Sequence, residues 1–358
     1  MFSQDTFGFF LSVLCKPPGP TLRPTLLAAP FGKSGFKDLT ICTRVRIRHV
    51  FAFHDPRRVC RPALSSDTAD VLEFTKHIWA GEDYIKYVWQ DWLHDPCGVL
   101  AIAQYGSHAV GMAKVTFVSR GQWWLEGLRV DPAHQSLGIA SHLHEYTNAW
   151  WLENGDGVVR LMTSSERVQV HHLCERTGYA RVGEVIAYRS TETLQRPPPP
   201  DAAPPPAHRQ PDSRPAFQRA TEDQVVAALA FASGHLGHSD GLMDSGWQFS
   251  TPDQDRLSTS AAGGHLHWWR DRQGLLSTFE DEQDGEPYLA IGFAAITRLS
   301  RLSQLLRDAA DLASRRGYAG VCWLAPAQER VQAALRAAGY ATDWEHAGFL
   351  YARRHPGR

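Results

Sequence analysis

The sequence of 358 residues lacks the patterns that mark several large classes of protein. No apolar run is long enough to form a membrane-spanning helix. The six cysteines form no C-x-x-C pair, which argues against a zinc ribbon and a disulfide framework, and reduced thiols are typical of a cytoplasmic protein. The net charge is only −1, so the composition argues against nucleic-acid and anionic-membrane partners. With 43% hydrophobic and 21% charged residues, a soluble globular protein is expected.

The seventeen histidines do not predict a metal site. His142 and His144 are two positions apart in a predicted helix, so their side chains face different directions. His265 and His267 share one face of a predicted strand, but no cluster of carboxylates or cysteines accompanies them. The sequence therefore predicts no metal cofactor.

Two segments have compositions that argue against packed structure. Residues 1–57 are rich in lysine and arginine, show little periodicity and carry no positive charge ahead of the apolar residues 7–15. We interpret them as a disordered leader, or as residues upstream of the true start codon, rather than as a signal peptide. Residues 194–215 contain nine of the 22 prolines and predict an extended linker, with a ligand for an SH3-type partner as the alternative.

The most informative stretch is residues 123–151. Apolar and other residues alternate from Trp123 to Val130, which predicts a strand. A set of apolar residues then recurs at helical spacing, which predicts an amphipathic helix; it comprises Ile139, Leu143, Tyr146 and Trp150. The residues that lead into this helix are Gln135, Ser136, Leu137, Gly138, Ile139 and Ala140.

This junction has the chemistry of an anion site. A helix N-terminus carries free backbone N–H groups and a partial positive charge. Gly138 and Ala140 have little or no side chain, so a diphosphate can approach the backbone closely. The lysine of a P-loop and the G-x-G-x-x-G of a dinucleotide fold are both missing.

The pattern L-R-V-D-P-x-x-Q-x-x-G-I-A followed by a helix resembles the acetyl-CoA motif of the GNAT superfamily of N-acetyltransferases. The family pattern is R/Q-x-x-G-x-G/A, which Gln135, Gly138 and Ala140 match. The resemblance implies a mixed α/β acetyltransferase fold and acetyl-CoA as co-substrate. It implies that residues 135–140 bind the diphosphate and that the main chain of Leu128, Arg129 and Val130 contacts the pantetheine arm.

The order of predicted elements agrees with that fold. A short strand near Cys60, two helices, three strands, the motif helix, a strand at 158–162, a helix at 166–176 and a strand near 184–189 predict a catalytic domain at residues 58–193. Residues 216–354 repeat part of this sequence, with E-R-V-Q and G-Y-A recurring in order. Residues 297–302 read TRLSRL, without the phosphate-site glycine, so we interpret the second half as a degenerate tandem copy that does not bind coenzyme A.

Glu126 is the candidate catalytic base. An amine must be neutral to attack a thioester, so a nearby base assists the reaction. Glu126 lies in mid-strand among aromatic residues, where partial desolvation raises the pKa of a carboxyl group, and many family members place a glutamate base on this strand. An ion pair with Arg129 or another cation is the alternative role. A backbone N–H near Leu128 or Arg129 is expected to stabilise the oxyanion.

One position departs from the family. The tyrosine that in many members protonates the leaving thiolate is replaced here by Cys174. Cys174 is either a substitute donor or a small buried apolar residue, and we favour the buried residue. The general acid therefore stays unassigned.

Three segments, residues 74–85, 92–93 and 126–130, resemble histidine N-acetyltransferase-like members of the family, and together they span about sixty residues. This resemblance implies that an amino-acid-like amine contacts carboxylates and an aromatic wall, with solvated helix-end carboxylates as the alternative. The candidate acceptor residues are Trp79, Glu82, Asp83, Tyr84 and Trp124.

The sequence thus predicts an N-acetyltransferase that transfers the acetyl group of acetyl-CoA to a primary amine of a small molecule. A non-catalytic acyl-CoA sensor and a protein N-terminal or lysine acetyltransferase are the alternatives. The oligomeric state is not predicted.

Overall fold

The computed structural model describes residues 51–52, 58–76, 78–81, 83–190, 215–237 and 240–357. These residues form two compact units. The first unit contains the described residues up to Arg181 together with residues 350–357, and the second contains those within 182–349. Phe51–Ala52 of the predicted leader forms a short strand, β1; the rest of that leader and residues 194–214 of the predicted linker lie outside the described residues. No helix of the described part is long and apolar enough to cross a membrane.

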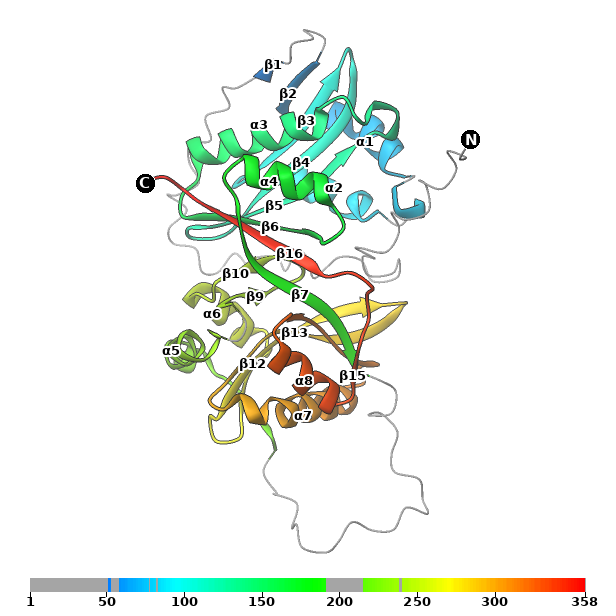
Figure 1. The fold of residues 1–358 in the computed structure, drawn as a ribbon. Coiled ribbons are helices and arrows are strands. Elements are labelled where there is room, and N and C mark those ends of the chain that lie inside the picture. Colours follow the sequence, from blue (N-terminus) through cyan, green and yellow to red (C-terminus); the bar gives the residue numbers. More distant parts are fainter. Residues whose placement is uncertain are drawn as a thin grey trace, which may run out of the picture. The chain divides into compact units, whose positions relative to one another are not determined.

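The first unit is built on one mixed sheet (Figure 1). Neighbouring strands of this sheet pair antiparallel from β1 to β5, whereas β5 and β6 pair in parallel. Its strands, in sheet order, are β1 (Phe51–Ala52), β2 (Arg58–Pro62), β3 (Val99–Tyr105), β4 (His108–Ser119), β5 (Gln122–Val130), β6 (Val158–Ser164) and β16 (Gly348–Arg354). Its helices are α1 (Thr68–Thr75), α2 (Ile85–Leu93), α3 (Ile139–Asn154) and α4 (Val168–Arg176).

Helices cover both faces of this sheet. A Cβ atom on Gly111 of β4 would lie 3.1 Å from the side chains of Ile139 and Leu143, so α3 packs closely on one face. On the other face α1 and α2 share a core with β3 and β4 that includes Trp89 and Met112. Because side chains alternate along a strand, Lys114 and Thr116 lie on the same face as Met112. The sheet therefore has an α3 face and an α1–α2 face.

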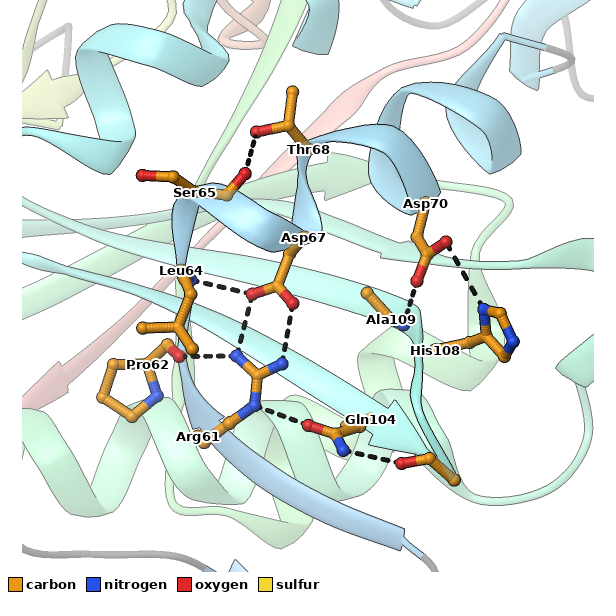
Figure 2. A network of polar contacts seen from close by, with 11 residues as sticks. Arg61, Pro62, Leu64, Ser65, Asp67, Thr68, Asp70, Gln104, His108 and Ala109 are labelled. Atoms are coloured by element: carbon orange, nitrogen blue, oxygen red, sulfur yellow. Dashed lines mark hydrogen bonds and ion pairs between the residues drawn. The ribbon is translucent and has the colours of Figure 1, made fainter.

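The start of α1 is fixed to the sheet by two carboxylates (Figure 2). Asp67 accepts two hydrogen bonds from the Arg61 guanidinium, at 2.7 and 2.8 Å, and one from the Leu64 N–H at 2.7 Å. Asp70 accepts a 2.8 Å hydrogen bond from the N–H of Ala109 at the beginning of β4. These bonds hold the helical segment that leads to α2 in a defined place on the sheet.

The last strand of the first unit comes from the far end of the sequence. We expected the strand near 184–189 to complete this sheet, but the strand beside β6 is β16, and residues 182–190 of β7 (Ala180–Ser190) belong to the second unit. The ring of Tyr351 stacks on His171 of α4 at 5.9 Å. His355 donates its N–H to the carbonyl of Gly157 and packs its ring 5.3 Å from Trp151 of α3. Sequence patterns do not specify such long-range strand pairing.

The second unit contains residues 182–190 of β7 and the strands β8 (Phe217–Arg219), β9 (Met243–Asp244), β10 (Phe249–Ser250), β11 (Leu266–Trp269), β12 (Gly274–Gln283), β13 (Glu286–Ile296), β14 (Gly320–Pro326) and β15 (Tyr340–Thr342). Its helices are α5 (Val225–His235), α6 (Gln254–Ala262), α7 (Leu302–Arg315) and α8 (Glu329–Ala337). Three antiparallel strands, β11, β12 and β13, precede α7, and the next strand, β14, pairs in parallel with β13 and is followed by α8. Apart from the additional strands β9 and β10, this order of elements matches that of the first unit.

Candidate active site

The predicted motif strand is β5, and its pairing changes along its length. It pairs with β6 only over three residues, Gln122 to Trp124, while its pairing with β4 continues to Val130. The two parallel strands therefore part in the middle of β5. This leaves one edge of the second half of β5 without β6 as a ladder partner.

A bulge in β5 lies at the same point. Glu126 is opposite Lys114 and Arg129 is opposite Met112, so two residues of β5 face one residue of β4. Gly127 within the bulge has φ of +65°, and a Cβ atom there would lie 2.6 Å from the ring of Trp92 in α2. Glycine is needed here both for the left-handed backbone and for the close approach of the indole.

Glu126, the predicted base, lies half-buried on the α1–α2 face. The hydroxyl of Thr116, on the neighbouring strand, donates a 2.5 Å hydrogen bond to its Oε1 atom. The residue directly opposite in the ladder is Lys114. The carboxylate is thus held on one oxygen by a neutral donor and faces a cation across the ladder. Its catalytic role stays a prediction.

Lys114 is a buried ammonium that the sequence analysis missed. Its side chain is 1% exposed, it forms an ion pair with Asp95 from the loop after α2, and it donates a 2.8 Å hydrogen bond to the carbonyl of Val115. A Cβ atom on Gly98 would lie 2.0 Å from the backbone carbonyl oxygen of Val115 and 2.4 Å from Lys114 Nζ, so that position admits only glycine. Burial lowers the pKa of Lys114, and the charges of Asp95 and Glu126 act in the opposite direction.

Arg129 links β5 to the segment before α2. Its Nε atom donates to Asp83 Oδ2 at 2.8 Å, and its guanidinium lies 5.5 Å from the centre of the Tyr84 ring. Asp83 is only 2% exposed and also accepts a hydrogen bond from the N–H of Ile85. Asp83 therefore meets a cation of the protein itself; its predicted contact with the acceptor stays a prediction.

The other predicted acceptor residues have different environments. Tyr84 contacts Trp92 edge to face at 5.9 Å, and these two rings border the bulge. Trp124 lies on the same face as Glu126 but is only 3% exposed, so it contributes chiefly to the core. Glu82 and the side chain of Trp79 lie outside the described residues.

The predicted phosphate site is an exposed turn ahead of α3. Asp131 caps the preceding 3₁₀ turn by accepting a 3.0 Å hydrogen bond from the N–H of Ala133. Gln135, Ser136, Leu137 and Gly138 are exposed, whereas Ile139 is only 2% exposed and anchors the start of the helix. Ser136 and Gly138 have left-handed backbones, with φ of +60° and +78°.

This geometry fits an anion. The helix begins at Ile139, so its first N–H groups have no carbonyl one turn earlier to bond. Gly138 is the N-cap residue and offers no capping side chain that would cover them, and Ala140 is half-buried with only a methyl group. The turn thus presents backbone donors to solvent at the end of the same strand that carries Glu126.

Helix α4 contains the departure at Cys174. The thiol is buried, and burial followed by the charge of Glu175 raises its pKa to about 12. A thiol with such a pKa holds its proton firmly at neutral pH and is a weak acid. This environment agrees with a buried apolar role.

The turn between β13 and α7 in the second unit differs from the turn ahead of α3. A 3₁₀ turn, Leu299–Arg301, leads directly into α7, and the N-cap residue is Arg301 with φ of −99°. Its guanidinium bonds to Gln273 and Gln304 and lies 4.9 Å from the centre of the Trp269 ring. No described residue of this turn is a glycine.

The described residues contain no group of three or more histidine, cysteine or carboxylate side chains placed to hold a metal ion. His144 is buried beside Thr177, with 2.8 Å between His144 Nε2 and Thr177 Oγ1, and burial together with the nearby arginines lowers its pKa to about 4.

Comparisons with known proteins agree with this geometry. Residues 67–179 match the model of the acetyltransferase (GNAT) family. The crystal structure of a GCN5-related N-acetyltransferase from Sphaerobacter thermophilus is 16% identical, with a TM-score of 0.53 over 84% of this chain and 97% of that chain. A fungal structure described as a glucosamine N-acetyltransferase region in a multi-domain β-N-acetylglucosaminidase is 13% identical, with a TM-score of 0.54 over 83% of this chain and 38% of that chain. A search of curated proteins gave no significant match.

At these identities the structural likeness establishes the fold alone, whereas the family match rests on the sequence of the part that carries β5, the exposed turn and α3. Residues 67–179 form a domain of the GNAT acetyltransferase family.

Proposed function

We propose that the first unit is an N-acetyltransferase that transfers the acetyl group of acetyl-CoA to a primary amine of a small molecule, by direct attack of the amine on the thioester. One observation carries the proposal: a single strand, β5, bears Glu126, parts from β6 beyond Trp124 and leads into the open turn before α3. Base, thioester and diphosphate sites then follow one another along one piece of chain. An amino-acid-like amine is our first candidate acceptor.

Acetyl-CoA supplies an activated acetyl group, and the protein positions it. The N–H groups at the start of α3, next to Gly138 and Ala140, bind the diphosphate. The main chain from Leu128 to Val130, without β6 as a partner, binds the pantetheine arm. The bulge at Gly127 turns this main chain away from regular pairing.

Glu126 takes a proton from the amine as its nitrogen bonds to the acetyl carbon. A backbone N–H near Leu128 or Arg129 stabilises the negative charge on the acetyl oxygen. The carbon–sulfur bond then breaks, and the thiolate takes a proton from solvent, because Cys174 is too weak an acid to supply one. The acceptor lies against Tyr84 and the neighbouring indole of Trp92.

We also infer that the second unit is a degenerate copy of the same fold that binds no coenzyme A. Its elements follow the same order, and its parallel pair, β13 with β14, again spans only three residues. The likeness to the Sphaerobacter structure extends over 84% of this chain and therefore includes parts of both units. Arg301 lies at the N-cap of α7, where the first unit has Gly138.

The experiment that tests the proposal is release of coenzyme A thiol from acetyl-CoA in the presence of candidate amines. The panel contains free amino acids, polyamines, aminoglycosides, glucosamine and peptide N-termini. Acceptor-dependent release is expected, with a fall of about 100-fold or more in kcat for Glu126→Gln. Glu73→Gln is the matched control, because Glu73 is exposed on α1 in an ion pair with Lys76, far from β5 in the sequence. Equal turnover by the two variants would remove Glu126 from the mechanism.

Cys174 favours a second candidate, a non-catalytic protein that binds acyl-CoA and senses it. A buried thiol in place of a proton donor leaves departure of the thiolate without a dedicated acid. Calorimetric titration with acetyl-CoA separates the two functions. Binding without release for any amine supports the sensor, release with peptides alone supports a protein acetyltransferase, and no binding refutes the assignment of residues 135–140.

A further inference from the structure

Lys114, which lies opposite Glu126 in the β4–β5 ladder, forms a buried ion pair with Asp95. The proposed chemistry assigns no role to this pair. Lys114 is one of the largest fully buried side chains of the described residues, and its partner Asp95 is 22% exposed. Removing an ammonium from water is costly unless opposite charges and hydrogen bonds surround it. The chain supplies the Asp95 carboxylate, the Val115 carbonyl and a glycine at position 98 that leaves room for the ammonium.

The ammonium belongs to the surroundings of Glu126. The two residues are directly opposite in the β4–β5 ladder, where Cβ atoms lie about 4.5–5.5 Å apart. The charge of Glu126 acts on Lys114, after the charge of Asp95. Further along β5, the cation of Arg129 is engaged by the buried carboxylate of Asp83. Lys114 is thus a cation directly opposite Glu126 in the ladder, and Asp95 is its ion-pair partner.

We infer that Lys114 is a positioning residue for the proposed base: its ammonium, anchored by Asp95 and directly opposite Glu126 in the ladder, keeps the Glu126 carboxylate ionised. The inference rests on the proposed role of Glu126. Thr116 holds one carboxylate oxygen by a 2.5 Å hydrogen bond, and Lys114 supplies the charge that favours the ionised form. An ionised carboxylate is the form that accepts a proton from an amine.

The direction of the effect follows from charge alone. Without the ammonium, the Glu126 carboxylate loses a favourable Coulomb interaction and takes up its proton at a higher pH. The acid side of the profile of kcat/KM against pH then moves toward neutral pH. The value at high pH, where Glu126 is ionised in either protein, stays close to that of the unaltered enzyme. Loss of fold or of a structural contact would instead lower the whole profile.

The test uses the full chain and two readouts. Carboxyl-labelled glutamate gives an NMR signal for Glu126 that is assigned by its absence in Glu126→Gln, and its titration needs no acceptor. We expect Lys114→Met to raise the midpoint of this titration and, at pH values below both midpoints, to lower kcat/KM about tenfold for each pH unit of displacement, with the KM for acetyl-CoA unchanged. Lys76→Met, at an exposed position on the first helical segment, is the control and leaves both readouts unchanged.

Folding is checked with a second variant. Lys114→Met leaves Asp95 near the surface, and the double variant Lys114→Met/Asp95→Asn removes the buried pair altogether, a change that proteins often tolerate. Both are expected to raise the midpoint. An unmoved midpoint in a folded variant overturns the inference while Glu126→Gln still reports on the base. Full turnover by Glu126→Gln overturns the proposed function, and the positioning role with it.

Discussion

Gly138→Ala separates the strain of a left-handed backbone from binding of the co-substrate. Gly138 is exposed and has φ of +78°, and an added Cβ atom would approach nothing closer than His142 Nδ1 at 3.6 Å, an ordinary contact. Alanine is therefore accommodated in space and is penalised only by its backbone, by about 1 kcal/mol. The corresponding fall in Tm is about 2–4 °C for a domain of this size.

The chain offers a matched control in Gly106, which lies in the turn between β3 and β4. It is exposed and has φ of +61°, and a Cβ atom there would meet nothing within 4 Å. Gly106→Ala is thus expected to cost the same stability as Gly138→Ala. Any difference between the two variants then comes from what surrounds Gly138 when acetyl-CoA is bound.

We expect Gly138→Ala alone to weaken binding of acetyl-CoA. A methyl group at the start of α3 holds a diphosphate away from the backbone donors, and a lost hydrogen bond to a charged group costs about 1.5–3 kcal/mol. This corresponds to a rise of about 10- to 100-fold in the Kd or KM for acetyl-CoA. Titration calorimetry and thermal melting of both variants supply the measurement. Equal affinities at equal Tm would refute the diphosphate site.

Three further outcomes follow from individual contacts. Burial raises the pKa of Asp244 from 3.8 to about 7, so the folded state keeps a proton that the unfolded chain releases. The resulting contribution to the free energy of unfolding is fully present below pH 4 and is lost as the pH rises toward 7, by up to about 4 kcal/mol. Urea unfolding at pH 5 and 7.5 should show this loss of stability in the unaltered protein and not in Asp244→Asn. Asp67→Ala leaves the Arg61 guanidinium without its buried partner and should lower the free energy of unfolding by about 3 kcal/mol. Glu73→Ala, at an exposed ion pair, should lower it by less than about 0.5 kcal/mol. Similar urea midpoints for the two variants would contradict a stabilising role of the Arg61–Asp67 pair. Gly127→Ala drives a methyl group into an indole ring and should reduce kcat more than the affinity for acetyl-CoA, whereas an unchanged kcat would argue against a role for the bulge.

The sequence predicted the motif strand and helix well because their signals are local. The alternation before Val130 and the helical spacing after Gly138 lie within thirty residues, and β5 and α3 have nearly the predicted bounds. The change of pattern after Asp131 coincides with the 3₁₀ turn that Asp131 caps, and aspartate before proline is typical of a turn.

Features that depend on long-range contacts escaped sequence reasoning. A lysine within HAVGMAKVTFVS reads as a solvent-facing residue of a strand, and its burial depends on Asp95 and on the missing side chain of Gly98, both in a distant loop. The assignment of Asp83 to an acceptor likewise overlooked Arg129, 46 positions later. Ion pairs between residues far apart in the sequence can be identified only once the strands and helices that carry them have been placed in three dimensions.

The strand β16 bears on how the protein is made. Residues 350–357 complete the sheet that begins with β1, so the first unit holds contacts between parts of the chain whose synthesis is separated by the whole second unit. During translation, one edge of β6 lacks its partner strand β16 while the second unit is being synthesised. An unpaired strand edge can pair with other chains and aggregate. Synthesis of β16, rather than completion of residue 181, is therefore the step that closes the unit bearing Glu126.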